Sequence, residues 1–385
     1  MGALDETRDL LSALIAYPTV SADSNLAMIR HLAKRLEDVG ADIDIWHDET
    51  GNKANLFATL GPKRSGGIVL SGHSDVVPVT NQNWSSDPFQ LVEQDDKWFG
   101  RGSCDMKGFI AATVVMAARY AKLPLSRPVH FAFTYDEEVG CLGAQDLAGR
   151  LRDFEFMPSV VVIGEPTSMR VIEGHKGCYE YTTRFHGLEG HGSAPELGVN
   201  AVEYAVRYVG KLLELKEALK GRAPKDSRFE PPWTTINTGG LSGGVAHNVI
   251  PNLAQVEWEM RPIRISDADF VKEELRLFRN LELLPAMQDV HPDADITTEV
   301  IGEVDGLEPM DTNAARDLVM ELTGANGTDV VPFGTEAGIF QDLGMDVVVC
   351  GPGSIEQAHK ADEFVSVDQM QQCLEMLDRL GTKLV

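Results

Sequence analysis

Six acidic and imidazole side chains stand just past apolar runs or at the start of a helix, where they can gather around metal ions. They are His73, Asp105, Glu137, Glu138, Glu165 and His359. The clearest apolar runs of this kind are residues 68–75, 129–138 and 159–166. In open α/β sheets, ligands bind at the carboxyl ends of the strands. Two imidazoles and three of the four carboxylates would suit Zn²⁺ or a similar divalent ion, so the pattern predicts a metal-dependent hydrolytic site.

The set divides between two metal ions, with one carboxylate left over. In a two-metal site the ions lie about 3.5 to 4 Å apart and lower the pKa of a shared water toward neutrality. The remaining carboxylate can take a proton from that water and pass it to the leaving group. Glu137 and Glu138 follow a strand-like run, and consecutive strand side chains point apart. One of the two can therefore bind metal while the other faces the water.

Each of these residues also has an ordinary explanation when it is taken alone. His73 and Asp75 would share one face of a regular strand, or Asp75 would orient the imidazole. Asp105 would be a first-turn residue that is stabilised by the helix N-terminus. The paired glutamates would form a solvated acidic turn, and His359 would be a surface histidine. Their combination, each after an apolar run or at a helix start, favours the metal site.

Length and charge limit the class of protein. A chain of 385 residues exceeds the usual size of a single core, so we expect two domains. Its 34 Lys and Arg stand against 59 Asp and Glu, which gives a net charge of -25. So acidic a surface repels nucleic acid and anionic membranes, and we therefore expect neither as a partner.

The apolar segments and the cysteines indicate the compartment. No apolar stretch approaches the roughly 20 residues that cross a bilayer. Asp5, Glu6, Arg8 and Asp9 stand before the apolar run that starts at Leu10, unlike the basic start of a secretory signal. The five cysteines are scattered, without the spacing of a zinc knuckle or a disulfide framework. These features predict a cytoplasmic protein.

The pattern of elements changes twice along the chain. In residues 1–176, β-type apolar runs alternate with helical segments such as 27–39 and 108–120, which predicts a mostly parallel sheet covered by helices. Residues 177–304 follow the order βαββαβ, which predicts a ferredoxin-like α+β domain. Residues 305–385 return to the first pattern. We therefore expect an α/β catalytic domain, 1–176 and 305–385, with a smaller domain inserted.

Seven motifs, spread in order over nearly the whole chain, carry a resemblance to a known family. They are SGHSDVVPV, GRGSCDMKG, YDEEVGCLGA, IGEPT, GLEGHGSAP, HNVIP and GPGSIEQAHKADE. Together they resemble the di-zinc aminoacylase and carboxypeptidase family of metallohydrolases. The resemblance implies two Zn²⁺ ions, with Co²⁺ or another divalent ion as an alternative occupant of one site.

The resemblance also implies a role for each site residue. His73 and Glu165 would bind one ion, Glu138 and His359 the other, and Asp105 would bridge both. The remaining roles in the catalytic domain fall on Glu137 as general base and Asp75 as the support of His73. A strained, cis Asp105–Met106 peptide is implied as well.

In this family the inserted domain is a lid and dimerisation module, so the resemblance implies a homodimer. His191 would reach the partner subunit's active site and stabilise the tetrahedral oxyanion. Arg261 would bind the α-carboxylate of the substrate through its planar fork, with Asn248 nearby. The ordinary alternatives are a capping histidine and a surface arginine. Glu259 stands where the family often has Asp, which leaves the local orientation open.

Among members of that family, the chain is most similar to those that deacetylate an amino acid in arginine biosynthesis. This implies removal of acetate from N-acetyl-L-ornithine to give L-ornithine. Glu336 could pair with the side-chain ammonium of ornithine, and a solvated loop glutamate is the alternative. Two other functions stay open. They are a deacylase for another N-acyl amino acid, such as N-succinyl-diaminopimelate, and a homologue that binds such amides without turnover.

Overall fold

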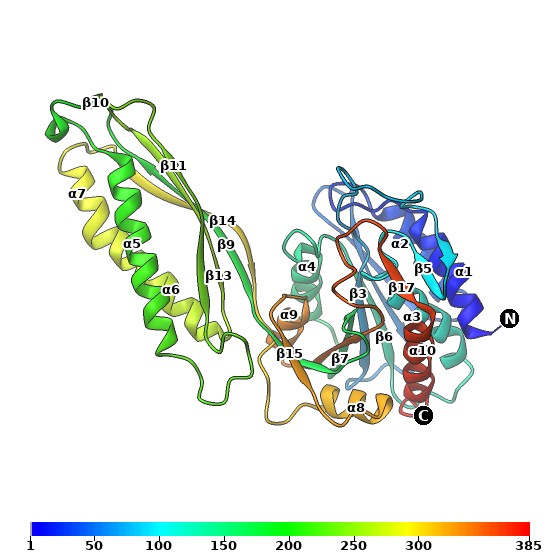
Figure 1. Ribbon diagram of the computed structural model, residues 1–385. Helices are drawn as coiled ribbons and strands as arrows, with labels where there is room; N and C mark the ends of the chain where they lie inside the picture. The colour runs from blue at the N-terminus through cyan, green and yellow to red at the C-terminus, as the bar shows by residue number, and fades with distance from the viewer. Residues whose placement is uncertain (1) are drawn as a thin grey trace. The chain divides into compact units, whose positions relative to one another are not determined.

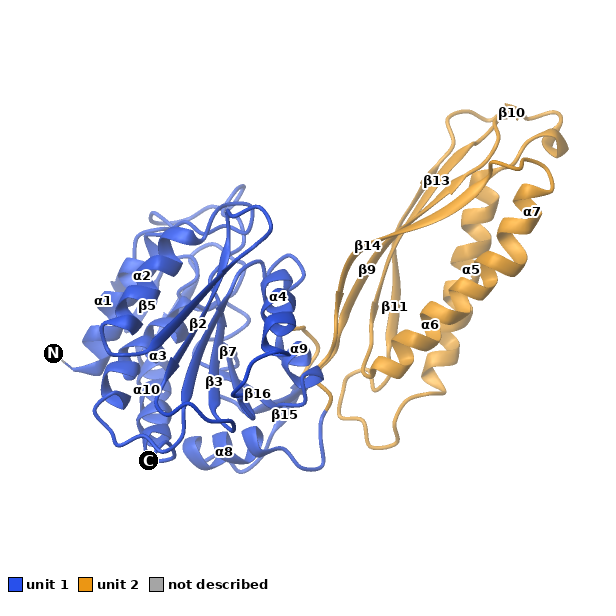
Figure 2. Cartoon of the chain, turned by 180° about the vertical axis from the view of Figure 1, so that it is seen from behind, with its two compact units in different colours: residues 1–174, 309–330, 335–385 blue, residues 175–308, 331–334 orange. Residues whose placement is uncertain are grey.

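The computed structural model describes residues 2–385, and the chain divides into two compact units (Figure 2). Unit 1 consists of Met1–Gly174, Pro309–Val330 and Thr335–Val385. Unit 2 consists of His175–Glu308 and Val331–Gly334, so it interrupts unit 1. Among residues 2–385, no helix combines the length and the apolar character that crossing a membrane requires.

The large sheet of unit 1 has a parallel centre and antiparallel margins (Figure 1). Its eight strands, in spatial order, are β1 (Asp42–His47), β2 (Ala54–Leu60), β6 (Val129–Thr134), β3 (Ile68–His73), β7 (Val160–Pro166), β16 (Asp346–Gly351), β8 (Ile172–His175) and β15 (Asp329–Val331). Strands β6, β3, β7 and β16 run parallel, whereas β1, β2 and β8 pair antiparallel. β3, β6 and β7 are buried along their whole length, because helices cover both faces of the sheet.

Helices pack on both faces of this sheet. They are α1 (Ala3–Ile15), α2 (Leu26–Glu37), α3 (Lys107–Tyr120), α4 (Leu142–Leu151), α8 (Ala314–Thr323), α9 (Ala337–Asp342) and α10 (Val367–Gly381). The nearly fully buried α3 contacts α1, α2 and α10 on one face, and α4 contacts α9 on the other. A small sheet of β4 (Val92–Gln94), β5 (Lys97–Phe99) and β17 (Phe364–Ser366) completes the unit. The predicted α/β fold is confirmed.

Unit 2 is a four-stranded antiparallel sheet with two long helices on one face. In spatial order its strands are β11 (Thr235–Gly243), β13 (Leu253–Arg261), β9 (Cys178–His186) and β14 (Asp295–Val304). Two helices, α5 (Ala201–Lys220) and α6 (Ile265–Phe278), pack on it, and α6 is followed by the short helical segments η2 (Arg279–Leu283) and α7 (Leu284–Gln288). The unit has its own apolar core, which includes Phe185, Tyr208 and Trp258. This strand order is that of a ferredoxin-like fold, as the sequence predicts.

Candidate metal centre

The carboxyl ends of the parallel strands bring the predicted ligands together within unit 1. His73 is the last residue of β3, and Glu165 lies in the neighbouring parallel strand β7. Asp105 lies in the loop before α3, and its peptide bond to Met106 is cis, as the resemblance implied. His359 lies in the loop that follows β16. Loops after adjacent parallel strands emerge at the same edge of the sheet, which explains how such distant residues meet.

Asp105 lies between two histidines. Its Oδ1 is 2.9 Å from Nε2 of His73, and its Oδ2 is 3.3 Å from Nε2 of His359. Glu138 Oε2 is 3.0 Å from the same nitrogen of His359, and Glu165 Oε1 is 3.5 Å from Nε2 of His73. One carboxylate therefore separates two groups of predicted ligands, and each group contains one imidazole and one glutamate.

The two adjacent glutamates are oriented by a turn rather than by strand alternation. β6 ends at Thr134, so the expectation that strand geometry separates Glu137 from Glu138 is wrong. Instead the carboxylate of Asp75 accepts the backbone N–H groups of Glu137 (3.1 Å) and Glu138 (3.3 Å), and also the hydroxyl of Ser21. A buried carboxylate in this position fixes the turn, because each N–H would otherwise lack a partner.

Asp75 also contacts the imidazole of His73. β3 ends at His73, so Asp75 lies beyond the strand and does not share a strand face with the histidine. The Nδ1 atom of His73 lies 3.0 Å from the backbone oxygen of Asp75 and 3.5 Å from its carboxylate. These contacts direct the other ring nitrogen, Nε2, toward Asp105. Holding the far ring nitrogen in this way is how proteins orient a ligand imidazole.

The charged groups of the cluster shift the pKa values of their neighbours. Hydrogen bonds to Asp105 and Glu138 raise the pKa of His359 to about 10. Burial raises the pKa of Asp105, but the hydrogen bonds to His359 and His73 outweigh it and hold that pKa well below its usual range. For Glu165 and Glu137, burial raises the pKa well above the ordinary value, and neighbouring carboxylates add to the shift. The protein thus collects more negative charge here than its own cations balance.

The residues present fit a pair of divalent cations. The buried Oε1 of Glu165 has no hydrogen-bond partner, which leaves a strong acceptor pointing into the cluster. Potential ligand atoms of His73, Asp105 and Glu138 lie within 4.8 Å of one another, as do those of His73, Glu137 and Glu165. Nitrogen and carboxylate donors at such spacing are typical of zinc and similar ions. Bound cations would balance the negative charge of the crowded carboxylates.

Glu336 belongs to the same interior. Its side chain is only 1% exposed and lies just before α9, so a solvated loop glutamate is excluded. Its carboxylate accepts the hydroxyls of Thr134 and Ser71. Burial raises the pKa of Glu336 to about 7, against the opposing effects of the Thr134 hydrogen bond and the charge of His73. A carboxylate held this way by two neutral donors can still accept a cation.

Three predicted residues belong to unit 2. His191 ends the short strand β10 (Gly190–His191), which pairs with β12 (Val249–Ile250), so it lies close to Asn248. His191 is exposed, and its Nδ1 is 2.8 Å from the hydroxyl of Ser193. Arg261, at the end of β13, forms an ion pair with Glu259 at 2.8 Å. The local orientation that the sequence left open is thus set by a contact within the strand.

Two charged residues that the sequence analysis did not single out lie beside the cluster. The carboxylate of Glu363 accepts the backbone N–H of Asp105, and Glu363 also pairs with the buried Arg101. Both residues are part of motifs that carried the resemblance, GPGSIEQAHKADE and GRGSCDMKG. Their positions in those motifs, beside His359 and Asp105, were the signal that was available.

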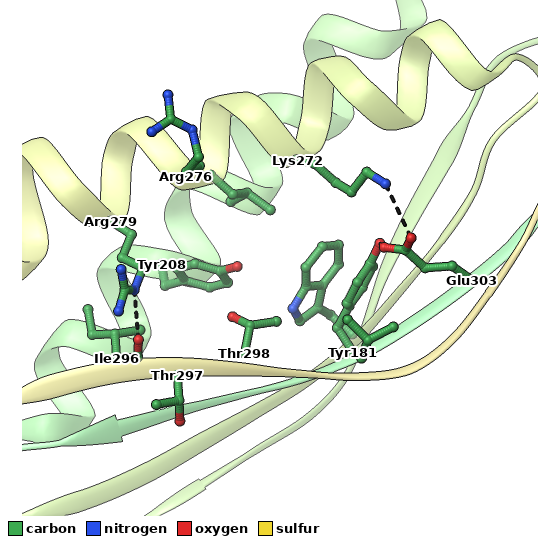
Figure 3. Close-up of a pocket in the computed structure, with 12 residues that line it drawn as sticks. Tyr181, Tyr208, Lys272, Arg276, Arg279, Ile296, Thr297, Thr298 and Glu303 are labelled. Carbon is green, nitrogen blue, oxygen red and sulfur yellow. Dashed lines mark hydrogen bonds and ion pairs between the residues drawn. The ribbon is translucent and has the colours of Figure 1, made fainter. Parts of the chain in front are cut away.

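A separate hollow of about 480 Å³ lies between α6 and β14 of unit 2 (Figure 3). Its aromatic lining residues, Tyr181, Tyr208 and Trp258, are at most 5% exposed, so they offer little surface to a ligand. Lys272, at one end, is paired with Glu303. None of the predicted ligands lines this hollow, so the chemistry is to be sought in unit 1.

Comparison of the sequence places the chain in a family of hydrolases. Residues 69–383 match the family described as peptidase family M20/M25/M40. The match spans most of the chain, so the protein belongs to this family and is a hydrolase. It is 33% identical over 379 residues to the acetylornithine deacetylase of Klebsiella pneumoniae (strain 342), which covers 97% of this chain and 96% of that protein.

Solved structures show the same fold. The M20 family metallo-carboxypeptidase Sso-CP2 of Sulfolobus solfataricus has a TM-score of 0.73 at 16% identity, and the alignment covers 99% of both chains. The aminopeptidase PepT of Bacillus cereus has a TM-score of 0.71 at 18% identity, over 98% of both chains. The YXEP protein of Bacillus subtilis, a dinuclear metal binding peptidase, has a TM-score of 0.62 at 15% identity, over 100% of this chain and 98% of that one.

Proposed function

We propose that this protein is a two-metal amide hydrolase that removes the acetyl group of N-acetyl-L-ornithine, giving L-ornithine and acetate. The observation that carries the proposal is the placement of Asp105, whose two oxygens face two separate groups of ligands. The 33% identity to an acetylornithine deacetylase over nearly the whole chain supports the substrate. The reaction belongs to arginine biosynthesis, and the scattered free cysteines favour a cytoplasmic setting.

Five residues would hold the two ions. His73 and Glu165 would bind one, Glu138 and His359 the other, and Asp105 both. Zinc is the ion we propose, with cobalt or another divalent ion as an alternative occupant of one site. Two such ions, when bound, lower the pKa of a shared water and polarise the amide carbonyl.

Glu137 would carry the proton. It belongs to neither proposed pair of metal ligands, yet it lies beside His73 and Glu165 in the cluster. Burial raises its pKa well above the usual value, and a raised carboxylate pKa suits a group that takes a proton and then returns it. In this scheme Glu137 accepts a proton from the attacking water and delivers it to the amine nitrogen as the C–N bond breaks.

Residues of unit 2 would bind the rest of the substrate. We assign the oxyanion contact to His191 and the substrate α-carboxylate to Arg261, with Asn248 close to His191. The Arg261 guanidinium has several N–H donors, so the ion pair with Glu259 leaves others for a carboxylate. The exposure of His191 is compatible with its donation to the active site of a partner subunit.

A homodimer through unit 2 is part of this proposal. β11 is an edge strand of the unit 2 sheet, and α5 packs beside it. Three apolar side chains on these elements, Val206, Leu213 and Leu241, are about half exposed or more, and so is Val245 in the loop after β11. An unpaired strand edge beside exposed apolar residues is typical of an interface, and a two-fold pair would cover both surfaces at once.

A substrate panel tests the proposed function. Protein reconstituted with counted equivalents of zinc is assayed with N-acetyl-L-ornithine, N-succinyl-diaminopimelate and other N-acyl amino acids. We expect the highest kcat/KM for N-acetyl-L-ornithine. A preference for the succinylated substrate would replace the proposal with that related deacylase. Binding of the amides with no turnover at any zinc loading would mean that the chain is a non-catalytic homologue.

A further inference from the structure

A second buried carboxylate, Glu363, lies behind the loop that carries Asp105. Its side chain is 1% exposed, and both of its oxygens are fully engaged. Oε1 accepts the backbone N–H groups of Cys104 (2.9 Å) and Asp105 (3.0 Å). Oε2 accepts the backbone N–H of Gly102 (3.0 Å) and Nη1 of Arg101 (2.7 Å). Nearly the whole loop before α3 is thus organised around one carboxylate.

The partner of this carboxylate reaches the loop that carries His359. Arg101 is also 1% exposed, and its guanidinium donates to the backbone oxygen of Lys360 (3.3 Å) and to Oε1 of Gln82 (2.6 Å). Gln82 in turn donates its amide N–H to the backbone oxygen of His359 at 2.9 Å. The ion pair therefore connects the loop of one proposed ligand with the loop of another.

The loop that carries His359 contains two residues in an unfavourable backbone conformation. His359 has φ +61° and Asp362 has φ +55°, a left-handed conformation that is unfavourable for residues other than glycine. Surrounding structure must hold residues in such conformations. Asp362 is held by the backbone N–H and the hydroxyl of Ser85, both at 2.8 Å, and Glu363 follows it directly.

We propose that Glu363 and Arg101 are a positioning pair, which fixes the Asp105 and His359 loops at the separation that two metal ions require. The inference rests on the proposed two-metal function and adds residues that do not themselves touch metal or substrate. Asp105 must present one oxygen to each ion, so small rotations of its loop break both contacts. A carboxylate that accepts the backbone N–H groups of Gly102, Cys104 and Asp105 restrains such rotations.

A purely structural role is the alternative. Buried ion pairs are weak evidence for stability, because desolvation of the charges offsets much of their attraction. A structural pair would affect the melting temperature without a specific effect on metal affinity. Metal affinity is therefore the readout that separates the two roles, and it needs no substrate.

The experiment is a zinc titration of metal-free full-length protein by calorimetry, with Glu363→Gln as the variant. The amide keeps the size of the side chain but cannot accept all four hydrogen bonds. We expect zinc affinity to fall about 10- to 100-fold, as for other residues that orient metal ligands. Wild-type zinc affinity in Glu363→Gln, even with a lower melting temperature, would overturn the proposal.

Glu173→Gln is the matched control. Glu173 is also a buried glutamate of unit 1 that pairs with an arginine, Arg316, at 2.9 Å. Its carboxylate also accepts the hydroxyl of Thr328. We expect this variant to lower the melting temperature while its zinc affinity stays that of the wild type. An equal loss of zinc affinity in both variants would show a general effect of destabilisation and would also overturn the proposal.

Arg101→Lys decides the matter if Glu363→Gln does not fold. Lysine keeps the charge but loses the fork that reaches Glu363, Lys360 and Gln82 together. We expect a smaller loss of zinc affinity in the same direction, and unchanged affinity would contradict the pair's role. Failure of the proposed function would look different, since wild-type protein would then bind zinc and leave the N-acyl amino acids intact.

Discussion

Replacement of Glu137 should reduce turnover without a loss of bound metal. It is part of the cluster, but the proposed ligand pairs around Asp105 do not include it. We predict that Glu137→Gln retains two equivalents of zinc and loses about 10²- to 10⁴-fold in kcat, the usual contribution of a general base. Zinc is counted by atomic emission on the same samples that are assayed.

The neighbouring glutamate provides the control. Glu138 lies 3.0 Å from His359 and is a proposed ligand, so Glu138→Gln should lose zinc as well as activity. If Glu137→Gln turned over N-acetyl-L-ornithine at nearly the wild-type rate, the assignment of the base would be wrong.

Glu336 carries the prediction for substrate choice. The structure buries it within unit 1, where a carboxylate is costly unless it binds a cation or is protonated. We predict that Glu336→Gln raises KM for N-acetyl-L-ornithine about tenfold or more, because an ion pair with the ornithine ammonium is lost. KM for an N-acetyl amino acid with an apolar side chain should stay the same. An unchanged KM for acetylornithine with kcat intact would remove Glu336 from the binding site.

At the scale of elements, we predict that the edge strand β11 and helix α5 form the dimer interface. Leu213 is 54% exposed on α5, and we predict that Leu213→Glu converts a dimer into a monomer by placing a charge in an apolar interface. Sedimentation velocity at micromolar concentration measures the change. Activity should fall with it, because His191 is proposed to serve the partner subunit.

Leu281→Glu is the matched control for this element. Leu281 is an exposed leucine of the same unit, 71% accessible, and it lies on η2, which is part of neither α5 nor β11. The variant should sediment like the wild type. A dimer that survives Leu213→Glu would show that α5 is not the interface.

At the scale of the whole molecule, the two units have separate cores and only one holds the proposed ligands. Cations that bind the folded state stabilise the region they bind. We predict that zinc added to chelator-treated protein slows amide hydrogen exchange around β3, β7 and the start of α3. Exchange in β9 and β13 of unit 2 should not change. Equal protection of both units, or of neither, would contradict a metal site confined to unit 1.

The sequence by itself determined the elements that carry the residues proposed to do chemistry. Apolar runs that end at His73 and near Glu165 fixed strand positions, because buried parallel strands are continuously apolar. The change of pattern after residue 176 predicted the second sheet, since the alternation of β and α segments follows from side-chain periodicity alone. Both are local properties of the chain, and the structure reproduces them.

The tertiary structure alone decided how these residues meet. The position of Asp105 between His73 and His359 depends on contacts between segments far apart in the chain, which no local pattern encodes. The turn held by Asp75 and the burial of Glu336 are long-range results of the same kind. The position of Glu363 could not be predicted, because the sequence does not distinguish a carboxylate that accepts backbone N–H groups from one that is solvated.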